Sequence, residues 1–340
     1  MIGLLSYNGD SNTNRLIEWL AYYKCDFVRV NMDDEDFRNI RVHIDRGRVA
    51  TSLKLKNGSW FNLSEFAYFY TRGKCFKKLP RVKNTTAMPT AVFNRYMQNE
   101  YDSLTKFFYA EVNRRSVGIF YTDAHIKLSQ LALAIEVGLP VCTTLITNSS
   151  ADVQEQFGRV GLITKAIEDN VGTIYRNRLV GQRVQRIDAY GIEDEFFPSL
   201  FQPEIEKDFE VRTFYLAGRT YSIRFKAPNT ESVDMRDSYG VMDYEAYVLD
   251  HSIQTKVKRL MDGLKLISGS LDFIVGKDGF TYFLEVNPNG QYDWVSQYGG
   301  YDLHKEIAQF LMHRNNNHRM SRAKKKKCRK HCLFRYFSSG

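Results

Sequence analysis

The stretch LDFIVGKDGFTYFLEVNPNGQ, residues 271–291, contains two runs of apolar and aromatic residues separated by Asp-Gly at 278–279. An Asp-Gly pair between two such runs favours a two-residue β-hairpin turn. That turn pairs Asp272 with Glu285 across the two strands. Because side chains alternate along a strand, Asn287 joins them on one face. The sequence therefore predicts a hairpin on which two carboxylates and one amide oxygen converge.

Two carboxylates that face each other on a sheet repel, at a cost of about 0.2–1 kcal/mol, and burial adds a desolvation cost. A bound cation would remove that conflict. Hard oxygen donors are the ligands that Mg²⁺ prefers, whereas Zn²⁺ would call for His or Cys at ligand spacing. The alternative at this point is a set of ordinary exposed polar residues on a hairpin.

The rest of the 340 residues is long enough for two or three domains. The first third predicts a strand, a helix and a strand, which is the beginning of an α/β layer, followed by a small sheet in which Arg41–Leu55 is extended and Asn-Gly at 57–58 forms a hairpin turn. Helical periodicity covers Asn94–Asn113 and Ile126–Val137. A domain boundary near residues 115–125 fits this pattern.

Beyond that boundary the pattern is mixed α+β. Two strands are predicted within Glu210–Phe225, a helix over Asp243–Leu264, the hairpin at 271–291 and a last helix over Asp302–His313. The predicted fold class is therefore α/β in the first domain and α+β afterwards.

The net charge of +9 is concentrated at the C-terminus, because Arg314–Gly340 contains ten Lys and Arg and no acidic residue. The remaining residues are close to neutral, so no nucleic-acid partner is expected. The basic segment is predicted to be a mobile, solvated tail, with contact to an anionic surface as the less favoured alternative. No apolar run reaches the roughly 20 residues that span a bilayer, and no signal peptide is evident at the N-terminus, so we expect a cytoplasmic protein.

The hairpin segment closely resembles the metal-binding signature of ATP-grasp ligases, in which an Asp on one strand and a Glu-x-Asn on the next hold the Mg²⁺ ions of the nucleotide. The resemblance implies ATP and Mg²⁺ as cofactors, with Asp272, Glu285 and Asn287 as metal ligands. Lys127 and Lys165, the latter within GLITKAI, resemble the two family lysines that contact the ATP phosphates. It also implies an ATP-grasp fold with an N-terminal pre-ATP-grasp α/β domain.

The segment SLFQPEIEKDFEVRTFYLAGRTYSIRF, residues 199–225, resembles the adenine-side linker of that family and the strand beyond it. The resemblance implies that Gln202, Glu204 and Ile205 lie along the adenine, that Glu210 takes the acidic ribose-side position and that Arg212 is the arginine near the reacting phosphate. Adenine needs a hydrogen-bonding edge with apolar walls, and an acyl phosphate needs guanidinium groups, so these residue types suit those roles.

The blocks TESVDMR, SGSLDFIV and FLEVNPNGQYDWVS narrow the resemblance to the graspetide maturases, the ATP-grasp ligases that cyclise microviridin-like precursor peptides. In that family an arginine of an Asp-aromatic-Arg block lies near the reacting carboxylate, which corresponds to Arg236 here. Met235 replaces the usual aromatic residue. His125 likewise stands where relatives more often have Asn.

The implied domains are 1–120 (pre-ATP-grasp), 121–200 (central ATP-grasp subdomain), 201–313 (C-terminal ATP-grasp subdomain) and 314–340 (tail). The implied activity joins Asp or Glu side chains of a ribosomally made precursor peptide to Thr, Ser or Lys side chains through an acyl phosphate. A homodimer is possible by analogy. The alternatives are another ATP-grasp carboxylate–amine ligase that adds an amino acid to an acceptor, and an inactive peptide-binding module.

Overall fold

The structure is a computed structural model of the chain. It describes residues 1–31, 39–72, 83, 89–120, 122–167, 173–175, 178–180, 184–226 and 242–336. The chain divides into two compact units, the first formed by Met1–Thr122 with Asp302–Gly340 and the second by Asp123–Tyr301. Residues 302–313, which were expected in the C-terminal subdomain, and residues 314–340, which were expected to form a separate tail, are both grouped with the N-terminal unit.

The first unit is built on a parallel sheet with the strand order β2-β1-β6-β7. Its strands are β1 (Ile2–Ser6), β2 (Phe27–Asn31), β6 (Tyr68–Thr71) and β7 (Ser116–Val117). Every residue of β1 and β6 is buried, as is typical of parallel strands that are covered on both faces. The predicted N-terminal α/β layer is confirmed.

A small antiparallel sheet, β3 (Ile40–Asp45), β4 (Arg48–Lys54) and β5 (Trp60–Asn62), belongs to the same unit. The turn at Asn57-Gly58 lies where the sequence predicts it, and Gly58 has a φ of +86°. The N–H of Leu55 donates to the carbonyl of Ser59 at 2.8 Å, so the loop has three residues and not the two that the Asn-Gly pair predicts. A second turn, with Gly47 at a φ of +77°, divides the extended segment expected over Arg41–Leu55 into two strands.

The described residues of the first unit also form the helices α1 (Ser11–Tyr22), α2 (Thr90–Asn113) and α7 (Leu303–Tyr336), with the short 3-10 helix η2 (Leu63–Glu65). The last helix was predicted to end at His313 and to be followed by a mobile tail, but α7 continues through the basic segment. Its sequence contains no Gly or Pro. Asn315 anchors it, because its Oδ1 accepts a hydrogen bond from the amino group of Met1 at 2.6 Å.

Among its described residues, the second unit contains two larger antiparallel sheets, ordered β12-β9-β13-β8 and β16-β15-β14-β17-β18, and the pair β10-β11. The first sheet consists of β8 (Leu145–Thr147), β9 (Leu162–Lys165), β12 (Gln185–Ile187) and β13 (Ser199–Pro203). The separate pair consists of β10 (Thr173–Tyr175) and β11 (Arg178–Val180). The second sheet consists of β14 (Lys207–Leu216), β15 (Arg219–Lys226), β16 (Asp243–Tyr247), β17 (Ser268–Gly276) and β18 (Thr281–Asn287). This part of the chain is α+β, as predicted.

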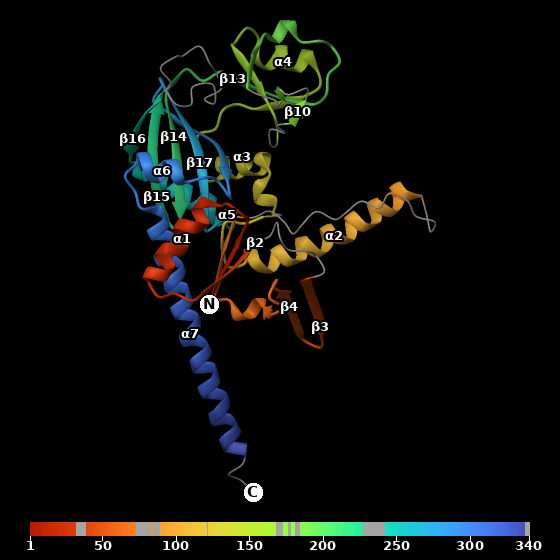
Figure 1. The fold of residues 1–340 in the computed structure, drawn as a ribbon. Helices are drawn as coiled ribbons and strands as arrows, with labels where there is room; N and C mark the ends of the chain where they lie inside the picture. Colours follow the sequence, from red (N-terminus) through yellow and green to blue (C-terminus); the bar gives the residue numbers. More distant parts are fainter. Residues whose placement is uncertain are drawn as a thin grey trace. The chain divides into compact units, whose positions relative to one another are not determined.

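The helices of the second unit are α3 (Lys127–Glu136), α4 (Ser150–Phe157), α5 (His251–Gly263) and α6 (Asp293–Tyr298), with the 3-10 helices η3 (Asp123–His125) and η4 (Ala189–Gly191). Helix α6 packs on β14, β15 and β16, and α3 packs beside β18 (Figure 1). No helix in the described ranges is long and apolar enough to cross a membrane.

The helix predicted over Asp243–Leu264 is wrong for its first part. Residues Asp243–Tyr247 form β16, the edge strand that pairs with β15. The helix begins only after Asp250, whose carboxylate accepts a hydrogen bond from the N–H of Ser252 at 2.8 Å. The edge strand has few buried side chains, so its sequence lacks the apolar alternation that would distinguish it from a helix.

Candidate active site

The hairpin that carries the acidic pair has a longer turn than the sequence predicts. The N–H of Gly276 donates to the carbonyl of Phe280 at 2.9 Å, and the N–H of Gly279 donates back to Gly276 at 3.0 Å, which leaves three residues in the loop. Gly279 has a φ of +83°, typical of the left-handed residue that closes a three-residue loop. The Asp278 carboxylate accepts from the N–H of Phe280 at 3.1 Å and stabilises this turn.

The longer turn displaces the strand pairing by one residue near the loop, where Val275 pairs with Thr281. The register shifts again at Leu284, which has no partner on β17, and Asp272 then pairs with Glu285. The predicted pairing of the two carboxylates is therefore confirmed although the predicted turn is wrong. One extra residue in the loop is offset by one extra residue, a β-bulge, in the strand.

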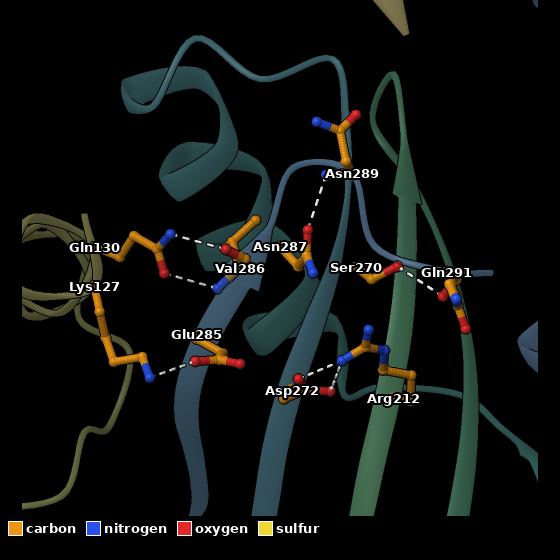
Figure 2. A network of polar contacts seen from close by, with 10 residues as sticks. All are labelled: Lys127, Gln130, Arg212, Ser270, Asp272, Glu285, Val286, Asn287, Asn289 and Gln291. Carbon is orange, nitrogen blue, oxygen red and sulfur yellow. Dashed lines mark hydrogen bonds and ion pairs between the residues drawn. The ribbon is translucent and has the colours of Figure 1, made fainter. Parts of the chain in front are cut away.

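Two cationic side chains flank the acidic pair (Figure 2). Arg212 on β14 lies opposite Asp272, and its guanidinium donates to both oxygens of that carboxylate. The Nζ of Lys127, the first residue of α3, lies 2.8 Å from Oε2 of Glu285. The two carboxylates are thus neutralised by the chain itself, so a bound cation is not needed to explain how they tolerate each other.

Burial and these partners shift the pKa values of the two carboxyl groups in opposite directions. Burial raises the pKa of Asp272, and the nearby charge of Arg212 compensates only in part. Burial also acts to raise the pKa of Glu285, but the charge and hydrogen bond of Lys127, together with Lys165, hold it below its ordinary value. The surroundings therefore favour the ionised form of Glu285 and disfavour that of Asp272.

Lys165, at the end of β9, belongs to the same electrostatic environment. Burial lowers the pKa of its amino group, the positive charge of Lys127 lowers it further, and Glu285 and Asp272 act in the opposite direction. Two lysines from different elements thus converge on the acidic pair. Such a concentration of cations at a buried site is suited to phosphate oxygens.

The third predicted metal ligand, Asn287, lies at the end of β18. Its side-chain oxygen accepts a hydrogen bond from the N–H of Asn289 at 3.0 Å, so this oxygen orders the following loop (Figure 2). The described residues contain no group of three or more His, Cys, Asp or Glu side chains that could hold a metal ion. Two carboxylates and one amide nevertheless form an oxygen set that fits Mg²⁺, whose coordination shell usually includes waters and phosphate oxygens.

The residues predicted to lie along the adenine come from β13 and the segment after it. Gln202 is buried and donates from Nε2 to Oγ1 of Thr144 at 2.7 Å. The N–H of Glu204 donates to the carbonyl of Gly161 at 2.9 Å. The carboxylate of Glu204 accepts hydrogen bonds from Nε and Nη2 of Arg186, which lowers the pKa of Glu204. Ile205 is half-buried. Their roles stay predictions.

The two remaining predicted residues are Glu210 and Arg236. Glu210 lies two residues before Arg212 on β14 and binds Lys207 at 2.7 Å. It lies close enough to Asp272 to help raise the pKa of that group. Arg236 and its neighbours Asp234 and Met235 lie outside the described residues.

Two residues near the acidic pair were not predicted from the sequence. Trp294 on α6 lies under the guanidinium of Arg212, with 5.6 Å from Cζ to the ring centroid. Gln130 on α3 binds the main chain of β18. The position of Trp294 in the sequence, three residues after the NPNGQ segment at 287–291, was the available signal that it lies near the acidic pair. No signal marks Gln130, since its partner lies 156 residues away in the chain.

Arg212 also indicates how the site could receive an anion. Its Nε is buried and has no hydrogen-bond partner among the described residues, although another nitrogen of the same group binds Asp272. A buried donor without a partner costs free energy. A ligand oxygen at this nitrogen would remove that cost.

No protein-family model matches the chain. No curated protein matches its sequence either. Solved structures do match. A RiPP-associated ATP-grasp ligase of Chryseobacterium gregarium, in complex with ADP and a leader and core peptide, has a TM-score of 0.74 at 17% identity, over 91% of this chain and 96% of that one.

The chain has the ATP-grasp fold. The macrocyclase MdnC of Microcystis aeruginosa MRC, bound to its precursor peptide MdnA, has a TM-score of 0.69 at 18% identity, over 91% of this chain and 98% of that one. The ATP-grasp ligase PsnB, complexed with a phosphomimetic variant of its minimal precursor, Mg and ADP, has a TM-score of 0.65 at 17% identity, over 92% and 98%. The predicted fold, with its N-terminal α/β domain, is thereby confirmed.

Proposed function

We propose that this chain is an ATP-dependent, ADP-forming peptide macrocyclase. It would activate Asp or Glu side chains of a ribosomally made precursor peptide as acyl phosphates and join them to Thr, Ser or Lys side chains as esters or amides. The observation that carries the proposal is the row formed by Lys127, Glu285, Asp272 and Arg212, which combines phosphate-binding cations with an Mg²⁺-type acidic pair. The shared fold with peptide-bound ligases supports the substrate class.

The carboxylates of this row and the cations beside them have different proposed roles. Asp272, Glu285 and Asn287 would hold Mg²⁺, which neutralises phosphate charge when it is bound. Lys127 and Lys165 would bind the phosphates from the other side. Because phosphoryl transfer depends on positioning and charge neutralisation more than on covalent help, this arrangement suits attack of a carboxylate on the terminal phosphate of ATP.

The peptide side of the reaction would depend on arginine. Arg212 would direct its unpaired Nε to the acyl phosphate or its leaving oxygen, and Arg236 would act there with it. The nucleotide base and ribose would lie along Gln202, Glu204, Ile205 and Glu210.

The proposal also covers the setting of the enzyme. We place it in the cytoplasm, where ATP and newly made peptides are available, with no nucleic-acid partner and with a homodimer as the assembly to test. Within the second unit, residues 121–200 and 201–301 would act as the central and C-terminal ATP-grasp subdomains.

The test is incubation of the purified protein with ATP, Mg²⁺ and a short peptide encoded beside its gene. Each cross-link removes one water from the mass of the peptide and releases one ADP, when the acyl phosphate forms, and one phosphate, when the hydroxyl or amine displaces it. Mass spectrometry and an ADP assay measure the two changes together. A mass gain of one amino acid would instead identify an amino-acid ligase. Peptide binding without ADP release would identify an inactive binding module.

A further inference from the structure

Gln130 is a buried polar residue of α3, 1% exposed, whose side-chain amide makes three hydrogen bonds to main-chain groups. Its Nε2 donates to the carbonyl of Val286 at 2.8 Å and to the carbonyl of Ala124 at 2.6 Å, and its Oε1 accepts from the N–H of Val286 at 2.8 Å. Figure 2 shows the amide facing β18. Gln130 therefore pairs with Val286 as a residue of a neighbouring strand would.

The contact between Gln130 and Val286 lies within the candidate active site. Val286 lies between Glu285 and Asn287, the two residues of β18 proposed to hold Mg²⁺. Gln130 lies three residues after Lys127 on the same helix, so the two side chains are on adjacent turns of one face. One amide thus ties the beginning of α3 to the strand that carries the partner of Lys127.

A fully satisfied buried amide is also a strict positional constraint. The helix cannot slide along β18 without breaking the two bonds to Val286, and each buried N–H or C=O left without a partner would cost free energy. The 2.8 Å separation of Lys127 and Glu285 lies within the region that this constraint holds.

We propose that Gln130 is a positioning residue that sets Lys127 against Glu285 for binding of the nucleotide phosphates and Mg²⁺. The inference rests on the proposed function for the identity of the ligand, but it concerns only nucleotide binding and needs no peptide. Gln130 itself touches no reacting atom in this account and acts through Lys127 and the main chain of β18.

The test uses Gln130→Met, which keeps the length of the side chain and removes the three bonds, and Gln130→Glu, which keeps only the acceptor to the N–H of Val286. Calorimetry would measure the affinity of the full chain for ATP in the presence of Mg²⁺. We expect both variants to bind ATP at least about tenfold more weakly than wild type, because they disturb the placement of Lys127 against Glu285, which is fixed before the ligand arrives.

A matched control separates positioning from general loss of stability. Asn315→Leu removes another buried amide, which binds Met1 and Cys25 in the first unit. We expect it to lower the melting temperature about as much as Gln130→Met while leaving the affinity for ATP and Mg²⁺ unchanged. If Gln130→Met lowered only the melting temperature, the inference would be wrong.

A double-mutant cycle with Lys127→Met tests whether Gln130 acts through Lys127. We expect the roughly tenfold loss of affinity to shrink to less than about twofold when Lys127 is already replaced, because coupled residues are not additive. An equal loss in both backgrounds would overturn the inference. A wild-type protein that binds ATP and Mg²⁺ but cyclises no peptide would contradict the proposed function alone, whereas one that binds neither would contradict both.

Discussion

The ion pair between Arg212 and Asp272 exposes 13% and 22% of the two side chains, whereas the pair between Lys258 and Asp262 on α5 exposes 57% and 59%. The exposed pair joins residues one helical turn apart, and water screens it. The buried pair joins two strands and carries its charges into a region where desolvation raises the pKa of Asp272. An ion pair is therefore screened by water on the surface of α5, whereas between β14 and β17 it carries a desolvation cost.

The difference shows what the buried charges are for. Desolvating two charges costs several kcal/mol, which their attraction returns only in part, so well-packed apolar residues would serve stability as well or better. Four charges in one row, with the Nε of Arg212 lacking a partner among the described residues, are better explained by a ligand that completes them. The exposed pair needs no such explanation.

The largest expected effect follows from removing a buried carboxylate. Asp272→Asn and Glu285→Gln should each reduce peptide-dependent ADP release by about 10²–10³-fold, because each removes a preorganised charge. The matched control is Asp278→Asn, an exposed carboxylate on the loop of the same hairpin. ADP release by the control should stay near wild type. Wild-type cyclisation by either buried-site variant would refute the metal assignment.

A second prediction concerns a buried cation. Lys165→Met should weaken binding of ATP by about 10²-fold, since it removes one of the two charges proposed to bind the phosphates. Calorimetry checks this, with Lys258→Met on the exposed face of α5 as the control.

The same Lys165 variant, which is expected to bind ATP less tightly, should be more stable than wild type in the absence of nucleotide. Its folded-state pKa is lowered, so in wild type its charge destabilises the fold below that pKa, and the destabilisation disappears as pH rises toward the unfolded value of 10.5. Lys165→Met should therefore raise the unfolding free energy of the nucleotide-free protein at pH 7 and remove this rise with pH. Urea unfolding at pH 7 and 10 measures both, and a variant less stable than wild type at pH 7 would contradict the assignment of burial as the cause.

A smaller effect should appear in acid, in protein without nucleotide or Mg²⁺. Because the folded pKa of Glu285 is lowered, its contribution is present above the unfolded value of 4.5 and is lost as pH falls through the folded pKa. The raised pKa of Asp272 has the opposite sign. Glu285→Gln should thus flatten the acid loss of stability, and Asp272→Asn should steepen it. Parallel slopes in urea unfolding from pH 3 to 6 would show that the two groups do not differ.

The smallest effect is expected at the exposed pair. Lys258→Ala should change the melting temperature by less than about 1 °C and leave ADP release unchanged, because solvent and salt screen its contact with Asp262. Differential scanning calorimetry at low and high salt is the measurement. A change of several degrees in the melting temperature would show that solvent exposure does not explain the difference between the Lys258–Asp262 pair and the Arg212–Asp272 pair.

The acidic pair shows how far a local pattern can lead. Alternation and the Asp-Gly signal were enough to predict that Asp272 faces Glu285, and that pairing is confirmed. The turn prediction was wrong because Asp-Gly also suits a three-residue loop, in which Asp278 accepts from the N–H of Phe280. The bulge at Leu284 carries no sequence signal of its own, since it depends on the partner strand.

The α/β layer of the first unit, with its apolar parallel strands, and the opposed carboxylates were determined by the sequence itself, because each follows from the period of side chains along one or two neighbouring elements. The partners that give the carboxylates their character were decided only by the tertiary structure. Arg212 reaches Asp272 across 60 residues and Gln130 reaches Val286 across 156. Contacts over such separations depend on how elements pack, and burial, which sets the charge states, exists only once they have packed.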